Sequence, residues 1–231
     1  FYSTNTASRL DGLSGFVFKK DSPSCGMERV KVYNDKGMPQ RDGTGIFARA
    51  VQKANPLLPV EEEGRLNDPV LRENFVSRVF VYARWQGLLQ QGLSKKALLD
   101  FHTSHKLLLM AHSPAAYREL GRMLAVLGKV ELDQLAGLYI LRVMQVLKKP
   151  ASRKRHVNVL QHILGYLRKH LDATSRADLV DVIDSYRRGT VPLVVPITLL
   201  QHSFRRRPHS WISRQVYMQP HPGELMLRNT I

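Results

Sequence analysis

The residue with the clearest chemical potential is Cys25, the one cysteine among 231 residues. It follows Ser22-Pro23-Ser24 and precedes Gly26, in a turn-forming run after an apolar stretch. We expect this turn to expose the thiol, Gly26 to let backbone N–H groups approach whatever the sulfur binds, and Lys19 and Lys20 to favour the thiolate. A lone cysteine is more commonly a small apolar side chain in a core, but the polar neighbours here favour a functional role.

Three histidines, His102, His105 and His112, fall in one predicted helix. His102 and His105 are separated by three residues, so both rings lie on one face, where they could hold zinc. No glutamate follows His102 as in a metalloprotease helix, and no third ligand is evident. Histidines packed or hydrogen-bonded between helices are the simpler interpretation. If His102 and the nearby Lys106 are functional, contact with a nucleotide or its phosphate is preferred to a metal.

Cationic residues gather in two runs in the second half of the chain. The first joins two predicted helices and contains no acid, and the second is flanked by Phe204, His209 and Trp211. Basic residues interleaved with aromatic ones suit phosphate contacts and stacking on an unpaired base, although such runs are commonly solvated surface. Besides His102 and Lys106, the residues predicted to bind RNA are Lys148, Lys149, Arg153, Lys154, Arg155, Arg168, Lys169, Arg205, Arg206 and Arg207.

The charge of the whole chain supports this interpretation. Lysine and arginine number 35 against 19 acidic residues, a net charge of +16, and residues 105–231 alone hold 20 basic and 8 acidic residues. Such a field favours a polyanion, with nucleic acid first and an anionic membrane surface second. No helix combines a lysine-rich face with a bulky apolar one, no apolar run reaches the ~18–20 residues of a membrane span, and no secretory signal is visible. The single cysteine fits a reducing compartment, so we expect a cytoplasmic protein without a membrane partner.

The acidic run Glu61-Glu62-Glu63 opposes the basic trend. Three adjacent carboxylates cannot all face phosphate, and we expect Arg65 to pair with one of them. Most such triplets are surface features or lie at helix starts. One glutamate of the run could serve as a general acid or base.

Two regions must position these residues. Up to about Gly45 the chain is glycine-rich, with short β-prone runs and turn signals, and a short helix is then expected. From Asn67 onward apolar residues recur at helical spacing. We therefore expect an α+β protein, with a small, incomplete α/β domain over residues 1–60, a mostly helical domain over 61–231, and residues 61–65 as the junction. The predicted strands are 16–18 and 30–33, the turns are 21–26 and 34–37, and the helices are 46–53, a helix from Pro69 capped by Asn67 or Asp68, helices after Ser94 and Ser113, and 132–147, 157–171, 176–186 and 197–203.

Two stretches, residues 19–27 and 58–68, resemble the bacterial thiouracil and tRNA 4-thiouridine desulfidases, the TudS/RudS group, in which a YbgA-type helical domain follows the desulfidase domain. The Ser-Pro-Ser-Cys-Gly motif is moderately specific alone. It is strong together with Pro-Val-Glu-Glu-Glu-Gly-Arg-Leu-Asn-Asp. The chain also resembles the YbgA pattern at Phe101-His102, His105-Lys106, Ala111-His112 and Gln215-Val216-Tyr217. The resemblance therefore covers almost the whole chain.

The resemblance implies a 4Fe–4S cluster held by three cysteines, at which a thiocarbonyl is hydrolysed without redox change. Cys25 matches the third of these ligands. The other two belong to an N-terminal part that this sequence, which opens at Phe1, does not contain, so we expect the chain as it stands to be inactive. By the same resemblance, Ser22, Ser24 and Lys20 line the substrate pocket, and an acid of the run Glu61–Glu63, with Glu62 as the candidate, moves protons.

These observations predict an iron–sulfur-dependent desulfidase that acts on 4-thiouridine in tRNA or on a free thiouracil, with the helical domain docking the tRNA. The alternative is a non-catalytic RNA-binding helical module. A third hypothesis is a zinc-dependent hydrolase that uses His102 and His105.

Overall fold

The computed structural model describes residues 10, 12–168 and 170–231. By contact density the chain divides into two compact units, Phe1–Arg84 and Trp85–Ile231. The first contains two small sheets and the second is helical, so the predicted α+β class is confirmed. The predicted domain boundary after residue 60 stays a prediction.

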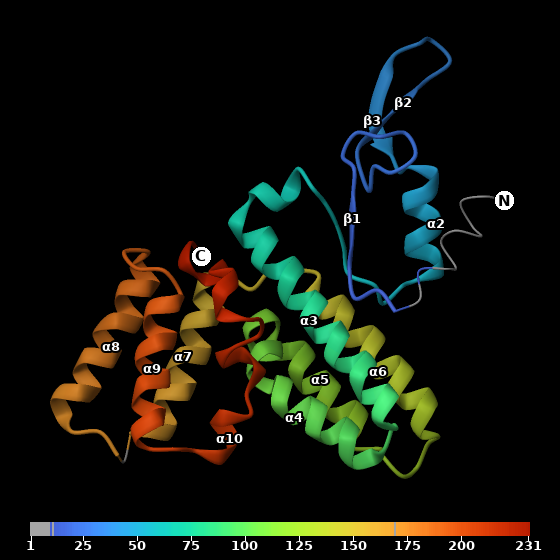
Figure 1. Cartoon of the computed structure of the whole chain (residues 1–231). Coiled ribbons are helices and arrows are strands. Elements are labelled where there is room, and N and C mark those ends of the chain that lie inside the picture. The colour runs from blue at the N-terminus through green and yellow to red at the C-terminus, as the bar shows by residue number, and fades with distance from the viewer. Residues whose placement is uncertain (1–9, 11, 169) are drawn as a thin grey trace. The chain divides into compact units, whose positions relative to one another are not determined.

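The first unit is organised around two parallel strands, β1 (Phe16–Phe18) and β4 (Val60–Glu62), with Phe16 opposite Val60 and Phe18 opposite Glu62. Parallel neighbours need a long crossover, and here it includes the Cys25 turn, a hairpin and helix α2 (Ile46–Ala54). Helix α2 packs Ala48 and Val51 against Phe18 and Leu58, beside β1 in Figure 1. The Cys25 turn therefore lies between a strand end and a helix start.

The hairpin consists of β2 (Val30–Tyr33) and β3 (Pro39–Gly43), paired antiparallel. Its turn is the predicted one. The Asn34 side chain accepts hydrogen bonds from the N–H groups of Lys36 (3.0 Å) and Met38 (2.9 Å), and Gly37 has a left-handed φ of 73°. This is the local side-chain bonding for which Asn is favoured in turns.

Helix starts follow the predicted caps. A 3₁₀ turn, η1 (Arg65–Asn67), leads into α3 (Pro69–Gln91), where the Asp68 carboxylate accepts from the N–H groups of Val70 (2.8 Å) and Leu71 (3.0 Å). Ser94 and Ser113 cap α4 (Lys95–His112) and α5 (Pro114–Leu124) in the same way. Each cap satisfies backbone donors that the first helical turn leaves unpaired.

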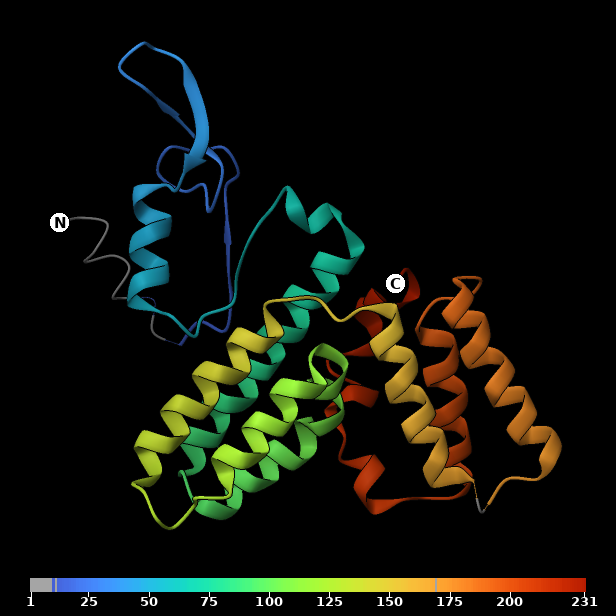
Figure 2. The ribbon, with the colours of Figure 1, turned by 180° about the vertical axis from the view of Figure 1, so that it is seen from behind.

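The second unit contains two groups of helices. Helices α4, α5 and α6 (Leu132–Leu147) pack on one another, and so do α7 (Arg153–Leu167), α8 (Ala173–Arg188) and α9 (Val194–Arg206), while α4 also contacts α7 (Figure 2). The chain then runs back through α10 (Ser210–Ser213), η2 (Val216–Met218), η3 (Gly223–Leu225) and η4 (Leu227–Asn229), with η2 against α4 and η4 against α9. Tyr139, Tyr186 and Tyr217 are among its most deeply buried side chains.

Two helix boundaries correct the predictions. Helix α7 spans 153–167 rather than 157–171. The cationic residues at its start were interpreted as a break between helices, but they form the first turn of α7. Helix α9 begins at Val194, so Pro196 lies in its first turn, where a missing N–H costs no helical hydrogen bond. Within the described residues, no helix combines the length and the apolar character of a membrane span.

Candidate functional site

The Cys25 turn brings a thiol and two hydroxyl groups together. The Cys25 N–H donates to Ser22 Oγ (3.2 Å), Ser22 Oγ lies 3.2 Å from Ser24 Oγ, and Ser24 Oγ lies 3.4 Å from Cys25 Sγ. Ser24 is exposed and Cys25 is half-buried. The structure therefore places three of the predicted site residues in one hydrogen-bonded chain at the surface of the turn.

The N-terminus of α2 holds the Cys25 turn in place by backbone hydrogen bonds. The N–H groups of Phe47 and Ala48 both donate to the Ser24 carbonyl, at 2.9 and 3.2 Å. A Cβ on Gly45 would lie 2.3 Å from that carbonyl oxygen and 2.8 Å from the Cys25 nitrogen, so only glycine allows this approach. Cys25 also packs, partly buried, against the small core under α2, which is the packing role considered for it, and its functional role stays a prediction.

Gly26 has a different role from the predicted one. Its N–H donates to the Ser22 carbonyl (2.8 Å), and a Cβ would lie 2.4 Å from Val30 Cγ2. The N–H is thus used to close the turn and is not directed at a ligand of the sulfur. Glycine is required here because the turn packs tightly on the start of β2.

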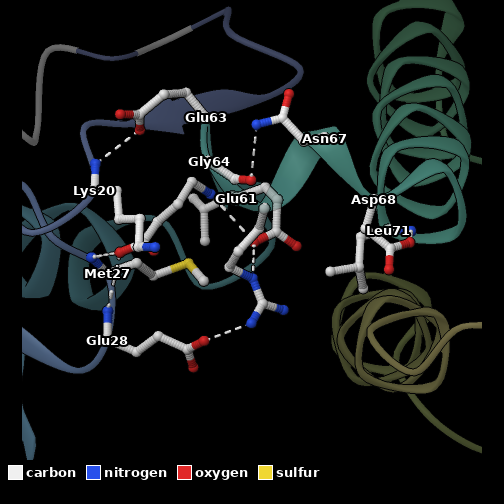
Figure 3. A network of polar contacts seen from close by, with 12 residues as sticks. Lys20, Met27, Glu28, Glu61, Glu63, Gly64, Asn67, Asp68 and Leu71 are labelled. Atoms are coloured by element: carbon white, nitrogen blue, oxygen red, sulfur yellow. Dashed lines mark hydrogen bonds and ion pairs between the residues drawn. The ribbon is translucent and has the colours of Figure 1, made fainter.

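The acidic run anchors the loops on both sides of Cys25 (Figure 3). Glu62 is 2% exposed, and its carboxylate accepts from the N–H of Met27 (2.7 Å) and, more weakly, from that of Glu28 (3.4 Å). Glu63 accepts from the Lys20 N–H (2.7 Å) and pairs with the Lys19 ammonium (3.2 Å). Partial desolvation opposes the effect, but these two donors lower the pKa of Glu63.

Glu61 forms the second half of the network. It is 4% exposed and accepts from Arg65 Nε (2.6 Å), while Arg65 also pairs with Glu28 (2.5 Å). The predicted pairing of Arg65 with the run is confirmed. Burial opposes it, but Glu61 raises the pKa of Arg65. Buried Arg78 lies 3.7 Å from the other Glu61 oxygen, and its burial lowers the pKa of Arg78. All three glutamates therefore interact with donors of the chain itself.

The two lysines near Cys25 make their observed contacts elsewhere. Lys19 pairs with Glu63, and the Lys20 side chain lies along Gly64, with its Cδ 2.9 Å from where a Cβ of Gly64 would be. Within the described part of the chain, no ion pair or hydrogen bond joins either ammonium group to the Cys25 turn. What lies beside the sulfur is the Ser24 hydroxyl, at 3.4 Å.

An iron–sulfur cluster of the implied kind needs three thiolates on the protein. The chain has one cysteine, and the described residues contain no group of three His, Cys, Asp or Glu side chains that could hold a metal. Cys25 fits as one ligand, on an accessible turn, but these residues do not complete a cluster site.

The histidines of α4 are hydrogen-bonded within the helical core. His102 Nδ1 lies 3.0 Å from the Tyr139 hydroxyl, His105 Nδ1 lies 2.7 Å from the Phe101 carbonyl, and His112 Nδ1 lies 2.8 Å from the Lys149 carbonyl. Burial and, secondly, the charge of Lys106 lower the pKa of His102. With no third metal ligand beside them in the described residues, these contacts support the packing interpretation over the zinc hypothesis.

Four of the predicted RNA-binding residues mark the two ends of α7, which are Arg153, Lys154 and Arg155 in its first turn and Arg168 just after its last residue. Arg153 lies over the Tyr186 ring and donates to the Tyr186 carbonyl (2.7 Å), and Arg155 donates to the His112 carbonyl, so part of the first run supports the fold. Arg168 follows the other end of α7, and Lys169 lies outside the described residues. A helix of 15 residues separates these ends by about 22 Å. Lys148, Lys149, Lys154, Arg168, Arg205, Arg206 and Arg207 are exposed.

Several residues at these sites were not predicted. Tyr166 stacks on Trp211 (5.0 Å between ring centroids) and touches His209 edge-on (5.0 Å), and Arg214 lines a pocket with Arg205. Tyr166 sits just before Arg168 in sequence, which was the available signal. Met27 and Arg78 gave no signal, because their contacts are with residues at least 17 positions away.

Comparisons with known proteins match two different families to the first and second parts of the chain. Residues 2–63 match the 2-thiouracil desulfurase family, which supports a desulfidase-type function at this level of detail. Residues 106–222 match a family described as "protein of unknown function (DUF1722)". A protein of Escherichia coli (strain K12), named "Uncharacterized protein YbgA", is 39% identical over 154 residues, 66% of this chain and 91% of that protein. No solved structure gives a significant match. The chain therefore belongs to the DUF1722 (YbgA-type) family and carries a segment of the 2-thiouracil desulfurase type before its helical region.

Proposed function

We propose that this protein removes sulfur from a thiolated uracil, with 4-thiouridine in tRNA as the substrate. The observation that carries the proposal is the Ser22–Ser24–Cys25 turn, held by the α2 N-terminus and by Glu62, within the segment similar to 2-thiouracil desulfurases. The reaction exchanges the thiocarbonyl sulfur for a water oxygen and releases sulfide, so no electron donor or acceptor is needed.

Within this proposal, Cys25 is one thiolate ligand of a 4Fe–4S cluster whose remaining ligands are not among the described residues. The hydroxyls of Ser22 and Ser24 orient the uracil by hydrogen bonds beside the sulfur, and Lys20 borders the same turn. Glu62 is assigned to proton movement by resemblance alone. Its hydrogen bonds to the Met27 and Glu28 N–H groups also give it a positioning role.

The RNA part of the proposal rests on charge. Residues 105–231 hold 20 basic and 8 acidic residues, and most of the predicted RNA-binding side chains are exposed. Lysine and arginine that neutralise phosphates release counterions, so tRNA binding is expected to weaken steeply with salt.

The test uses the native polypeptide, purified anaerobically from its own cells and supplied with tRNA that contains 4-thiouridine. We expect sulfide release with loss of the thiocarbonyl absorbance, and loss of both in Cys25→Ser. Sulfide release at the normal rate by Cys25→Ser would refute the assignment of the site. Release from free 2-thiouracil but not from tRNA would refute the assigned substrate.

The second candidate, an RNA-binding module without catalysis, is favoured by one observation, that the DUF1722 match covers 106–222 while the Cys25 turn lies outside it. It predicts salt-dependent tRNA binding by the native protein with no sulfide release from any thiolated uracil.

A further inference from the structure

A pocket of about 600 Å³ lies in the helical unit between the end of α9, α10 and η2. This volume is within the range of sites that hold small ligands or single nucleotides. Its apolar wall includes Phe204, Ile212 and Met218, and three of its polar lining residues are Arg205, His209 and Arg214. No lining residue is acidic.

The two arginines of this pocket have no counter-charge. Arg205 and Arg214 are exposed, and within the residues that the structure describes they form no ion pair and no side-chain hydrogen bond. Arg207, only two residues away, does not line the pocket. Arg205 and Arg214 are therefore available to an anionic ligand.

A series of rings and one lysine continues from the pocket; we call it the aromatic ridge, formed by His209, Tyr166, Trp211, Lys106, Tyr117 and His102. His209 lies 5.0 Å from Tyr166, which stacks on Trp211, and the Lys106 ammonium lies 5.6 Å from the Trp211 ring and 5.4 Å from the Tyr117 ring. Tyr117 in turn stacks on His102 at 5.8 Å. All six residues are half-buried, so part of each remains accessible to a ligand.

We propose that the pocket and the aromatic ridge bind unpaired nucleotides of an RNA chain. Arg205 and Arg214 hold phosphates, one base enters the pocket against Phe204, and a neighbouring base stacks at Trp211 and Tyr166. Guanidinium groups are well shaped for phosphate, and bases stack on aromatic side chains without sequence preference. This deepens the proposed function and rests on it for RNA as the substrate class.

The experiment titrates the full chain with hexauridylate, a probe that has no sulfur, and follows the fluorescence of tryptophan. Of the two tryptophans, Trp85 is 3% exposed and Trp211 is half-buried, so quenching reports on the ridge. We expect saturable quenching that is lost in Trp211→Phe. Arg205→Gln and Arg214→Gln should each weaken binding about tenfold and should each lower the salt slope by about 0.7.

The matched control is Arg176→Gln, which removes the same charge from an exposed position of α8, outside the pocket lining and outside the predicted RNA-binding set, and it should change affinity less than about twofold. Equal losses in Arg205→Gln and Arg176→Gln would overturn the pocket, since only net charge would then matter. Competition by inorganic phosphate or by polyglutamate as strong as that by hexauridylate would overturn the nucleotide assignment. Because the probe is not a desulfidation substrate, failure here leaves the proposed activity standing, and loss of that activity leaves this binding result unchanged.

Discussion

Removal of the Glu62 carboxylate tests whether the acidic run holds the Cys25 turn in place. Glu62 is 2% exposed, and its strongest contact is the 2.7 Å hydrogen bond from the Met27 N–H, two residues after Cys25. In Glu62→Ala this N–H loses its charged acceptor, and no nearby side chain in the described network replaces it. The loop that follows Cys25 should then open far more often.

The expected size of the effect follows from the two terms involved. A hydrogen bond to a charged group contributes about 1.5–3 kcal/mol, and a buried donor left without a partner costs about 1–3 kcal/mol. Removal of a buried charge recovers part of its desolvation cost, because here the partners of Glu62 are backbone amides and not a cation. We therefore expect Glu62→Ala to destabilise the loop by about 2–3 kcal/mol. Glu62→Gln, which keeps an acceptor oxygen, should cost about 1 kcal/mol.

Hydrogen exchange at the Met27 amide measures this effect where it occurs. A change of 2–3 kcal/mol corresponds to exchange about 30–150 times faster. The alkylation rate of the Cys25 thiol should rise in the same order, Glu62→Ala above Glu62→Gln above the wild type. A local readout is preferable to a melting curve, since a chain of two compact units need not unfold in one step.

Glu63→Ala is the matched control, because Glu63 is adjacent but much more exposed, with 41% of its side chain accessible, and pairs with Lys19 at the surface. It should leave Met27 exchange within about threefold of the wild type. If Glu62→Ala and Glu63→Ala accelerate exchange equally, or if neither does, Glu62 does not position the loop.

Two further predictions concern backbone packing and pH. Gly45→Ala should destabilise the Cys25 turn by about 1–3 kcal/mol, because its Cβ would meet backbone atoms of Ser24. Gly87→Ala, with open space around it in α3, should instead stabilise the protein by up to about 1 kcal/mol. Urea unfolding and the alkylation rate of Cys25 distinguish the two variants. The pKa of His102 is lowered by burial and Lys106, so its contribution to stability is complete above its ordinary value of 6.5 and is lost as the pH falls from 6.5 through the folded pKa. The slope of unfolding free energy against pH below 6.5 should therefore be flatter in His102→Gln than in the wild type, and an unchanged slope would contradict this account.

Local signals predicted much of the fold. Capping residues lie next to the helices they start, so Asp68, Ser94 and Ser113 could be identified from sequence, and the β-branched run at Val30 gave β2. Strand β4 was not predicted, because two of its three residues are glutamates, which have low β propensity. The two glutamates of β4 are stabilised by partners elsewhere in the chain. Arg65 and Arg78 pair with Glu61, and the Met27 N–H donates to Glu62. The contacts of Arg78 and Met27 are distant in sequence.

The candidate site divides in the same way. Ser22, Ser24 and Cys25 are neighbours in sequence, so the prediction that they share a turn depended on local chemistry. The partners of Lys19 and Glu62 could not be predicted, because they depend on how β1 and β4 align with the loop between them. The predicted RNA-binding residues were likewise grouped by sequence alone, whereas the length of α7 separates its basic first turn from Arg168 at its other end.

The negative charges of the acidic run oppose polyanion binding by the basic helical region only if they are left uncompensated, and in the folded chain they are compensated. Glu61 and Glu63 pair with Arg65 and Lys19, and Glu62 is buried against backbone N–H groups, so the three negative charges are largely compensated within the first unit. Arg205 and Arg214 have no such partners among the described residues. The acids near the turn and the cations that pair with them cancel locally, whereas the pocket arginines keep their charge, so we expect a polyanion to be attracted mainly to the pocket. On this argument Glu63→Lys, which adds positive charge beside the turn, should strengthen tRNA binding less than Arg205→Gln weakens it. Filter binding of tRNA to the native protein, compared at two salt concentrations, measures both changes, and a gain from Glu63→Lys larger than the loss from Arg205→Gln would show that tRNA is held mainly at the turn.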